Sequence, residues 1–122
     1  MKINEITQQE KQKFLDGDCI DLAYVLAQEL HVPYITIIVT NFTNTNKRNI
    51  RHAFVEIGND KAVDILGITS FNNMLRKHKT KTSTVERIPV NKVRSYAALL
   101  PKSDHVVIKT KIIPKLLTNV SQ

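Results

Sequence analysis

The stretch that decides the fold is RHAFVEIGNDKAVDIL, residues 51–66. Its two halves, 51–57 and 61–66, are rich in apolar, β-branched and aromatic residues, and the turn-forming Gly-Asn-Asp segment at 58–60 separates them. This pattern predicts two antiparallel strands joined as a hairpin. Each strand carries one side chain suited to acid–base chemistry, His52 in the first and Asp64 in the second.

The register of the hairpin decides whether these two side chains meet. A three-residue loop pairs Ile57 with Lys61 and Phe54 with Asp64, so that His52 and Asp64 project from the same face as diagonal neighbours. A two-residue loop places them on opposite faces, because a slip of one residue inverts the pleat. A working His–Asp pair therefore predicts an odd loop or a bulge in this hairpin.

A helix is predicted upstream of the hairpin, from Cys19 to Leu30. The apolar residues of this segment recur at three- and four-residue steps, and Asp18 stands at the N-cap position. A proline at position 33 ends the helix, and the β-branched run at 34–40 predicts a buried strand.

Weaker patterns complete the chain. Thr7 and Glu10 have the spacing of a capping box, and Thr69-Ser70 can cap a helix that includes Met74. The remaining segments predict a strand over 86–90, a helix over 91–100 and a strand over 105–113. Together the elements predict a single α+β domain over 1–122, with the cysteine-bearing helix packed on a mainly antiparallel sheet.

The composition agrees with one folded domain. The chain has 122 residues, of which 42% are hydrophobic, with three Gly and four Pro. No apolar stretch is long enough to span a membrane, the N-terminus lacks the apolar core of a signal peptide, and one cysteine cannot form an intramolecular disulfide. These features predict a cytoplasmic site of action without membrane contact.

The charge is unevenly distributed. Residues 1–60 hold six Lys/Arg and eight Asp/Glu, a net charge of −2, whereas residues 61–122 hold twelve and three, a net charge of +9. The C-terminal half is therefore expected to build a basic surface suited to nucleic acid or to an acidic protein. A solubilising surface without a partner is the alternative.

Cys19 has the position of a nucleophile. A helix N-terminus favours the thiolate, and its free N–H groups can bind the oxyanion that forms when sulfur attacks a carbonyl. Asp16, Asp18 and Asp21 oppose this, because nearby negative charge raises the pKa of a thiol. A base, His52, would have to outweigh them.

A lone cysteine at a helix start is more often an ordinary small apolar residue. What favours catalysis is Asp64, which lies inside an apolar strand where an unpaired carboxylate is costly and His52 is the available partner. Ligand spacings for a metal are absent from the sequence, so neither a metal nor a cofactor is expected. His78 falls in a charged run and is expected to be solvated, and His105 has no evident partner.

The segment 17–23 (GDCIDLA), the HAFVE motif at 52–56 and the following Val63-Asp64 resemble the papain-like and transglutaminase-like cysteine superfamily. The resemblance covers about residues 14–70, and the basic half, 71–122, is expected to complete the sheet. It implies a papain-like core in which Cys19 is the nucleophile, His52 the base and acid, and Asp64 the orienting carboxylate. Gln12 is a candidate for the upstream oxyanion glutamine.

Compact members of this superfamily include bacterial effector and polymorphic-toxin domains, delivered as parts of larger secreted proteins. By this resemblance the substrate is a protein or peptide amide, acted on by deamidase, transglutaminase or peptidase chemistry. An acidic immunity protein is an expected partner of the basic half.

Two other functions stay open. The first is an RNA-targeting toxin in which His52 and Cys19 act beside phosphate-binding cations. The cations proposed for this role are Lys77, Lys79, Lys81, Arg87, Arg94 and Lys111. The second is a non-catalytic interaction domain. Aromatic residues make up only 6% of the chain, which leaves little base stacking for RNA.

Overall fold

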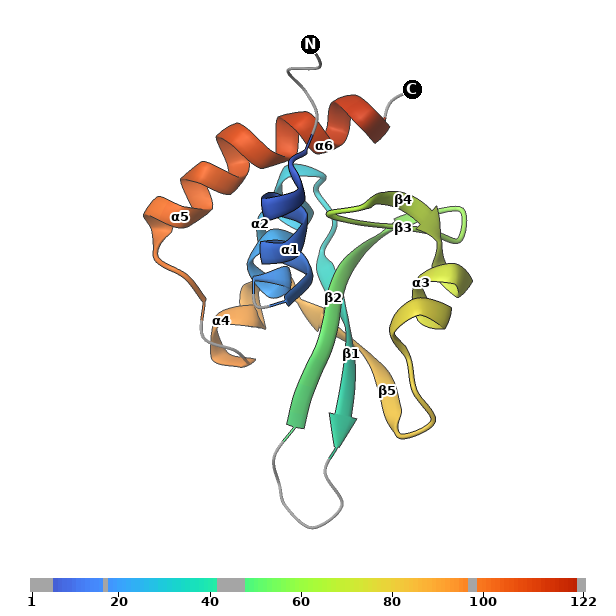
Figure 1. Cartoon of the computed structure of the whole chain (residues 1–122). Helices are drawn as coiled ribbons and strands as arrows, with labels where there is room; N and C mark the ends of the chain where they lie inside the picture. Colours follow the sequence, from blue (N-terminus) through green and yellow to red (C-terminus); the bar gives the residue numbers. More distant parts are fainter. Residues whose placement is uncertain (1–5, 17, 42–47, 97–98, 121–122) are drawn as a thin grey trace.

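The computed structural model describes residues 6–16, 18–41, 48–96 and 99–120. Its centre is a five-stranded antiparallel sheet with the strand order β4-β3-β2-β1-β5 (Figure 1). The strands are β1 (Tyr34–Asn41), β2 (Arg48–Gly58), β3 (Lys61–Asp64), β4 (Gly67–Ser70) and β5 (Ser83–Pro89). The predicted α+β class and the antiparallel sheet are confirmed.

Helices cover both faces of this sheet. They are α1 (Gln8–Asp16), α2 (Cys19–Glu29), α3 (Phe71–His78), α4 (Val93–Tyr96), α5 (Lys102–Val107) and α6 (Ile113–Val120), with a 3₁₀ turn at Val90–Lys92 and a π-helical turn at Ile108–Ile112. Across the described ranges, no helix is both long and apolar enough to cross a bilayer.

The alternation of side chains along β1 and β2 divides the core into two layers. Ala53 and Val55 pack under α2 in the larger layer, which also receives the isoleucines of the C-terminal helices. His52 and Phe54 project from the opposite side of β2, where Phe54 packs with Met74 of α3. The α2 layer and the α3 layer are therefore separated by the sheet.

The hairpin between β2 and β3 contains the predicted irregularity. Val55 faces Val63, a register that puts Phe54 opposite Asp64, but Gly58 rather than Ile57 is the partner of Lys61. The loop thus has two residues, Asn59 and Asp60, both at positive φ, and the register shifts at Ile57. A two-residue loop with a bulge restores the parity of a three-residue loop, so His52 and Asp64 share a face.

Most predicted helix starts are confirmed. Thr7 and Glu10 exchange the two hydrogen bonds of a capping box (2.8 and 3.1 Å), and the Ser70 hydroxyl accepts the Asn73 N–H (3.0 Å). Asp18 stands at the N-cap of α2, but its side chain makes no capping bond there and lies 3.8 Å from Lys13.

The C-terminal third differs from the prediction. Residues 102–120 form a helical run instead of a strand over 105–113, and the helix predicted over 91–100 is reduced to the 3₁₀ turn and α4. Ile108, Ile112 and Leu116 recur at four-residue steps and are buried in the α2 layer. The π-helical turn ends two residues before Pro114, which cannot donate a backbone hydrogen bond to the preceding turn. From the basic half, β5 completes the sheet and the helices cover it.

Candidate functional site

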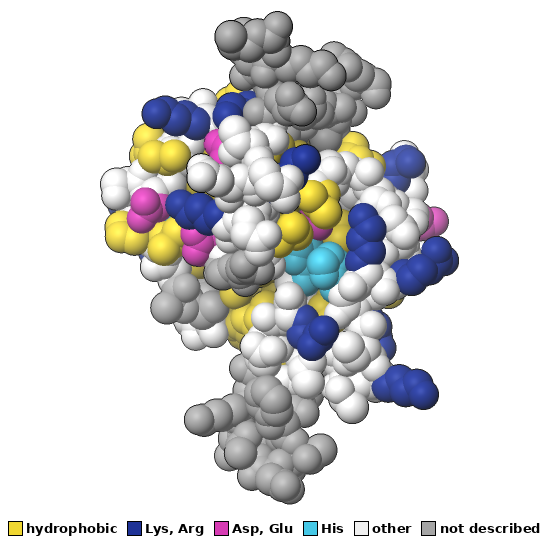
Figure 2. Space-filling model, in the orientation of Figure 1, with side chains coloured by type: hydrophobic (Ala, Val, Ile, Leu, Met, Phe, Trp, Pro, Cys, Tyr) yellow, Lys and Arg dark blue, Asp and Glu magenta, His cyan; other side chains and the backbone are white. Residues whose placement is uncertain are grey.

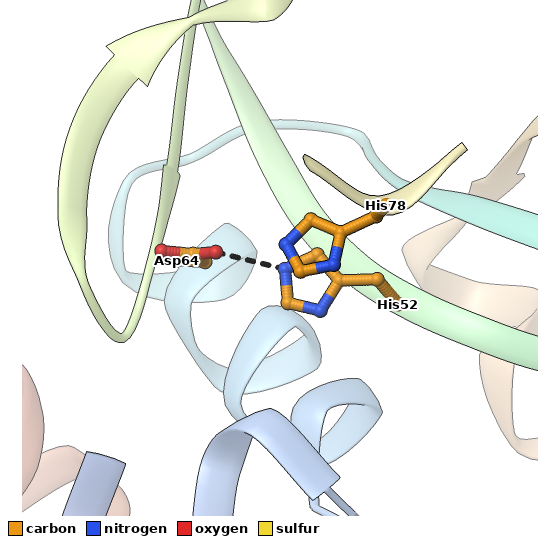
Figure 3. Close-up of side chains that lie close together, drawn as sticks. All are labelled: His52, Asp64 and His78. Carbon is orange, nitrogen blue, oxygen red and sulfur yellow. Dashed lines mark hydrogen bonds and ion pairs between the residues drawn. The ribbon is translucent and has the colours of Figure 1, made fainter. Parts of the chain in front are cut away.

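His52 and Asp64 form a buried pair on the α3 side of the sheet (Figure 3). The His52 Nε2 atom lies 2.8 Å from Asp64 Oδ2, and the other carboxylate oxygen accepts the Leu66 backbone N–H at 2.8 Å. His52 is fully buried and Asp64 is 6% exposed. The predicted partnership of these two residues is confirmed, and it arises from the bulge in the hairpin.

A second histidine, predicted from the sequence to be solvated, joins this pair. His78 ends α3, and its ring stacks on that of His52 with 3.7 Å between centroids and 16° between planes. The ring is partly buried. The helical spacing of Phe71, Met74, Leu75 and His78 on one face of α3 is the sequence signal that could have shown it.

The three side chains are close enough to suggest a metal site, but their orientation is unsuited to one. A ligand atom from each of His52, Asp64 and His78 lies within 4.8 Å of the others. A metal bonds an imidazole nitrogen in the plane of the ring. Because the two rings are stacked and nearly parallel, an ion in the plane of one ring would lie outside the plane of the other, where its nitrogen lone pair is not directed. The cluster therefore fits acid–base chemistry better than metal binding.

Cys19 begins α2, as predicted, and lies in the α2 layer of the core, 5% exposed. Burial raises the pKa of its thiol, backbone hydrogen bonds at Ala53, Ile20 and Cys19 itself oppose that rise, and the negative charge of Asp21 adds to it. The net direction is upward, so the thiol rests in its protonated form and not as a preformed thiolate.

Cys19 and His52 lie on opposite sides of β2 and are not hydrogen-bonded. The thiol contacts the backbone of Ala53, the residue that follows His52. The His52 Nδ1 atom is buried and has no hydrogen-bond partner among the described residues. The structure thus unites His52 with Asp64, whereas a bond between Cys19 and His52 is not formed.

The other elements of the predicted site are less closely connected to it. Gln12 lies on α1 with an exposed side chain. Gly17 of the quoted GDC motif lies outside the described residues.

The predicted phosphate-binding cations do not form one surface. Lys77, Lys79 and Lys81 are exposed around the end of α3, on the side of the sheet that carries His78. Arg94 stacks over Tyr24 of α2, and Lys111 belongs to the π-helical turn that packs in the α2 layer. Only the three lysines therefore adjoin the histidines.

Arg87 faces the α3 side but is already neutralised. Its guanidinium binds both carboxylate oxygens of Glu56, at 2.6 and 2.9 Å, and lies over the Phe71 ring. This bidentate bond holds the pKa of Glu56 below its usual value despite partial burial. A cavity of about 330 Å³ opens beside the pair, lined also by Tyr34 and the hairpin loop.

Five cations lie near His78: Arg51, which donates to the His78 carbonyl, and four that stand within three residues of His78 along the chain. They are Arg51, Arg76, Lys77, Lys79 and Lys81, here called the basic collar. All five are exposed, and no ion pair joins any of them to another described residue. Figure 2 shows histidine surrounded on this face by hydrophobic side chains on one side and Lys and Arg on the other.

The stack predicts a pH dependence of stability. Burial, with the nearby charge of His52 adding, lowers the pKa of His78 to about 4, from an ordinary value of 6.5. The unfolded chain therefore binds a proton at higher pH than the folded one, and stability should fall as the pH drops from about 6.5 to about 4. Solvent screening of the partly exposed ring limits the loss to roughly 1–2 kcal/mol.

Urea unfolding of the wild type and of His78→Phe between pH 7 and 4 measures this dependence. The phenylalanine variant should lack this share of the loss, since its ring does not titrate. Equal slopes in the two proteins would show that His78 is not buried against His52 in solution.

No family model, no curated protein and no solved structure matches the chain.

Proposed function

We propose that the protein is a thiol-dependent amidohydrolase or acyltransferase, in which Cys19 is the nucleophile, His52 the base and acid, and Asp64 the residue that orients His52. The observation that carries this proposal is the state of the His52 ring. Asp64 engages Nε2, and Nδ1 has no described partner, while the Cys19 thiol contacts the backbone of the next residue, Ala53, from the other face of β2. A base oriented through one nitrogen with the other available is the arrangement that nucleophilic catalysis requires.

The chemistry follows from a neutral thiol. The two side chains lie on opposite faces of β2, so this mechanism requires them to come into contact when the substrate binds. As the sulfur attacks an amide carbon, the thiol proton then passes to His52 Nδ1, and Asp64 stabilises the resulting imidazolium. The proton then passes to the departing ammonia or amine as the C–N bond breaks and leaves a thioester. Water resolves the thioester in deamidation or peptide cleavage, and an amine resolves it in transamidation.

The first turn of α2 supplies backbone N–H donors for the oxyanion. The N–H groups at the first turn of α2 have no partner within the helix, and the Asp18 side chain does not cap them. Backbone hydrogen bonds at Cys19 and Ile20 reach the sulfur, so these N–H groups are close to where a tetrahedral oxyanion would form. Gln12 is a weaker candidate for this task.

A papain-like core is the finer fold that this proposal implies, with the cysteine helix against the strand that carries histidine. The size and the basic collar suit a toxin or effector domain with a cytoplasmic target. An acidic immunity protein fits the collar by charge, and we propose the collar as its docking surface or as that of an acidic protein substrate.

The test is the pH dependence of Cys19 alkylation by iodoacetamide in the wild type and in His52→Ala. With His52 as the base, the wild type should react at neutral pH, and removing the imidazole should slow that reaction by about 10²-fold or more. His31→Asn is the matched control, because His31 is exposed beyond the opposite end of α2, at a positive φ that asparagine tolerates. If all three proteins react equally slowly, with onset above pH 8.5, His52 does not activate Cys19 and the triad is excluded.

An RNA-targeting toxin is the second candidate, favoured by the basic collar beside two histidines. Its weakness is the stack itself, because two rings in contact leave no room between them for a scissile phosphate. Ribonuclease activity that persists in Cys19→Ala and falls steeply with salt would favour this function over the first. A Cys19→Ala variant with full biological effect and no cleavage of any kind would instead indicate an interaction domain.

A further inference from the structure

His78 belongs neither to the β2–β3 hairpin, which carries His52 and Asp64, nor to α2, which begins with Cys19. It is the last residue of α3, and its ring covers the ring of His52 on the side away from the sheet (Figure 3). Of the three clustered groups, His52 is fully buried and Asp64 nearly so, while His78 alone is partly exposed. The solvent-facing layer of the cluster is therefore the His78 ring.

Two hydrogen bonds fix the end of α3 that carries this ring. Arg51, the residue before His52, donates from Nε to the His78 carbonyl oxygen at 3.1 Å. The helix ends there with a bond from Lys79 N–H to the Leu75 carbonyl at 2.7 Å. Because Arg51 and His52 are adjacent on β2, the first bond sets the distance between the strand that carries one ring and the helix that carries the other.

The His78 ring is uncharged at neutral pH, as its partly buried position requires. Burial and the neighbouring His52 keep the pKa of His78 at about 4, so at neutral pH it is an uncharged aromatic cover. Its Nε2 atom is buried and unpaired among the described residues, and one of its ring nitrogens lies within 4.8 Å of an Asp64 carboxylate oxygen. A hydrogen bond to a carboxylate is stronger where water is excluded.

We propose that His78 is a positioning residue for the proposed triad, which holds the His52 ring in the plane of Asp64 and excludes water from the bond between them. The inference rests on the proposed function, since what His78 positions is the base for Cys19. Positioning of this kind keeps His52 Nδ1 directed away from Asp64 and fixes which nitrogen carries the proton.

The test compares His78→Ala with His78→Phe by two readouts. The first is ¹H–¹⁵N NMR of the His52 Nε2–H proton, whose exchange with water reports the cover directly and does not involve Cys19. Exchange should be at least ten-fold faster in the alanine variant, and within about three-fold of wild type in the phenylalanine variant, which keeps the stack. Arg51→Gln removes the bond from the Arg51 guanidinium to the His78 carbonyl but keeps the His78 ring, so it should give an intermediate exchange rate.

The second readout is the rate of Cys19 alkylation at pH 7, which should fall in His78→Ala and be retained in His78→Phe. Unchanged Nε2–H exchange in His78→Ala would overturn the proposal, as would faster exchange with no effect on a reactive Cys19. If wild-type Cys19 is itself unreactive while exchange responds as expected, the cover over His52 and Asp64 is supported and the cysteine chemistry alone fails.

Discussion

Replacing Asp64 by alanine is expected to lower the free energy of unfolding by about 3–5 kcal/mol, the largest effect of any single substitution in the cluster. The carboxylate is buried, and both of its oxygens are used, one by His52 and one by the Leu66 backbone. Its removal leaves a buried imidazole nitrogen and a backbone N–H without partners. Urea unfolding at pH 7 measures the loss.

Asp64→Asn separates stability from chemistry. The amide keeps the volume and one acceptor oxygen, so the loss of stability should be about 1–3 kcal/mol. An amide N–H facing His52 Nε2 requires that nitrogen to be the acceptor, which moves the ring proton to Nδ1. Neutral-pH alkylation of Cys19 should then fall nearly as far as in His52→Ala.

The matched control is Glu29→Ala, which removes a carboxylate from an exposed pair with Lys109 at 3.4 Å. This substitution should cost less than about 1 kcal/mol, because surface ion pairs contribute little. If Asp64→Ala costs no more than Glu29→Ala, the buried pair does not exist in solution.

The second large effect is expected at Asp21, which anchors the C-terminal helices to α2. Its Oδ1 atom accepts hydrogen bonds from the Leu100 N–H at 2.8 Å and from His105 Nε2 at 2.9 Å. His105, expected from the sequence to have no partner, therefore has one in Asp21, and it also packs on Tyr24. Asp21→Ala should destabilise the protein by roughly 2–4 kcal/mol, because two donors lose one buried acceptor.

Asp21→Asn gives a second, independent result. The negative charge of Asp21 contributes to the raised pKa of Cys19, so its neutralisation should shift the onset of Cys19 alkylation to lower pH. Asp18→Asn is the control, since it also removes one charge at the start of α2, but from a carboxylate that lies 3.8 Å from the compensating charge of Lys13. Equal effects of the two substitutions would contradict the assigned role of Asp21.

Local sequence was sufficient for much of the scaffold. The capping residues of α1 and α3, the helix from Cys19 and the strand over 34–40 follow from patterns confined to a few neighbouring residues, and each is confirmed. The partnership of His52 with Asp64 was also predictable. A hairpin relates its two strands through the loop alone, and a carboxylate in an apolar strand requires a partner.

The error at 105–113 has a different origin. β-Branched residues there favour a strand by intrinsic preference, whereas the four-residue spacing of Ile108, Ile112 and Leu116 is helical. Burial decides between the two, because Thr110, which would share a strand face with Ile108 and Ile112, is exposed, while Ile113 is buried beside Ile112. Propensity is a weaker constraint than packing, and this segment follows the packing.

The sequence by itself therefore determined the α+β class, the cysteine at a helix start and the His52–Asp64 pair, since each depends on residues close along the chain. Only the tertiary structure decided what surrounds that pair. Two of these contacts join residues that are far apart along the chain: His78 stacks on His52, 26 positions away, and His105 binds Asp21, 84 positions away. Arg94 and Lys111 lie on the opposite face of the sheet from the basic collar. Such contacts are set by how the helices pack against the sheet. The helical spacing in α3 marks the face on which His78 lies, but it does not say which ring that face meets.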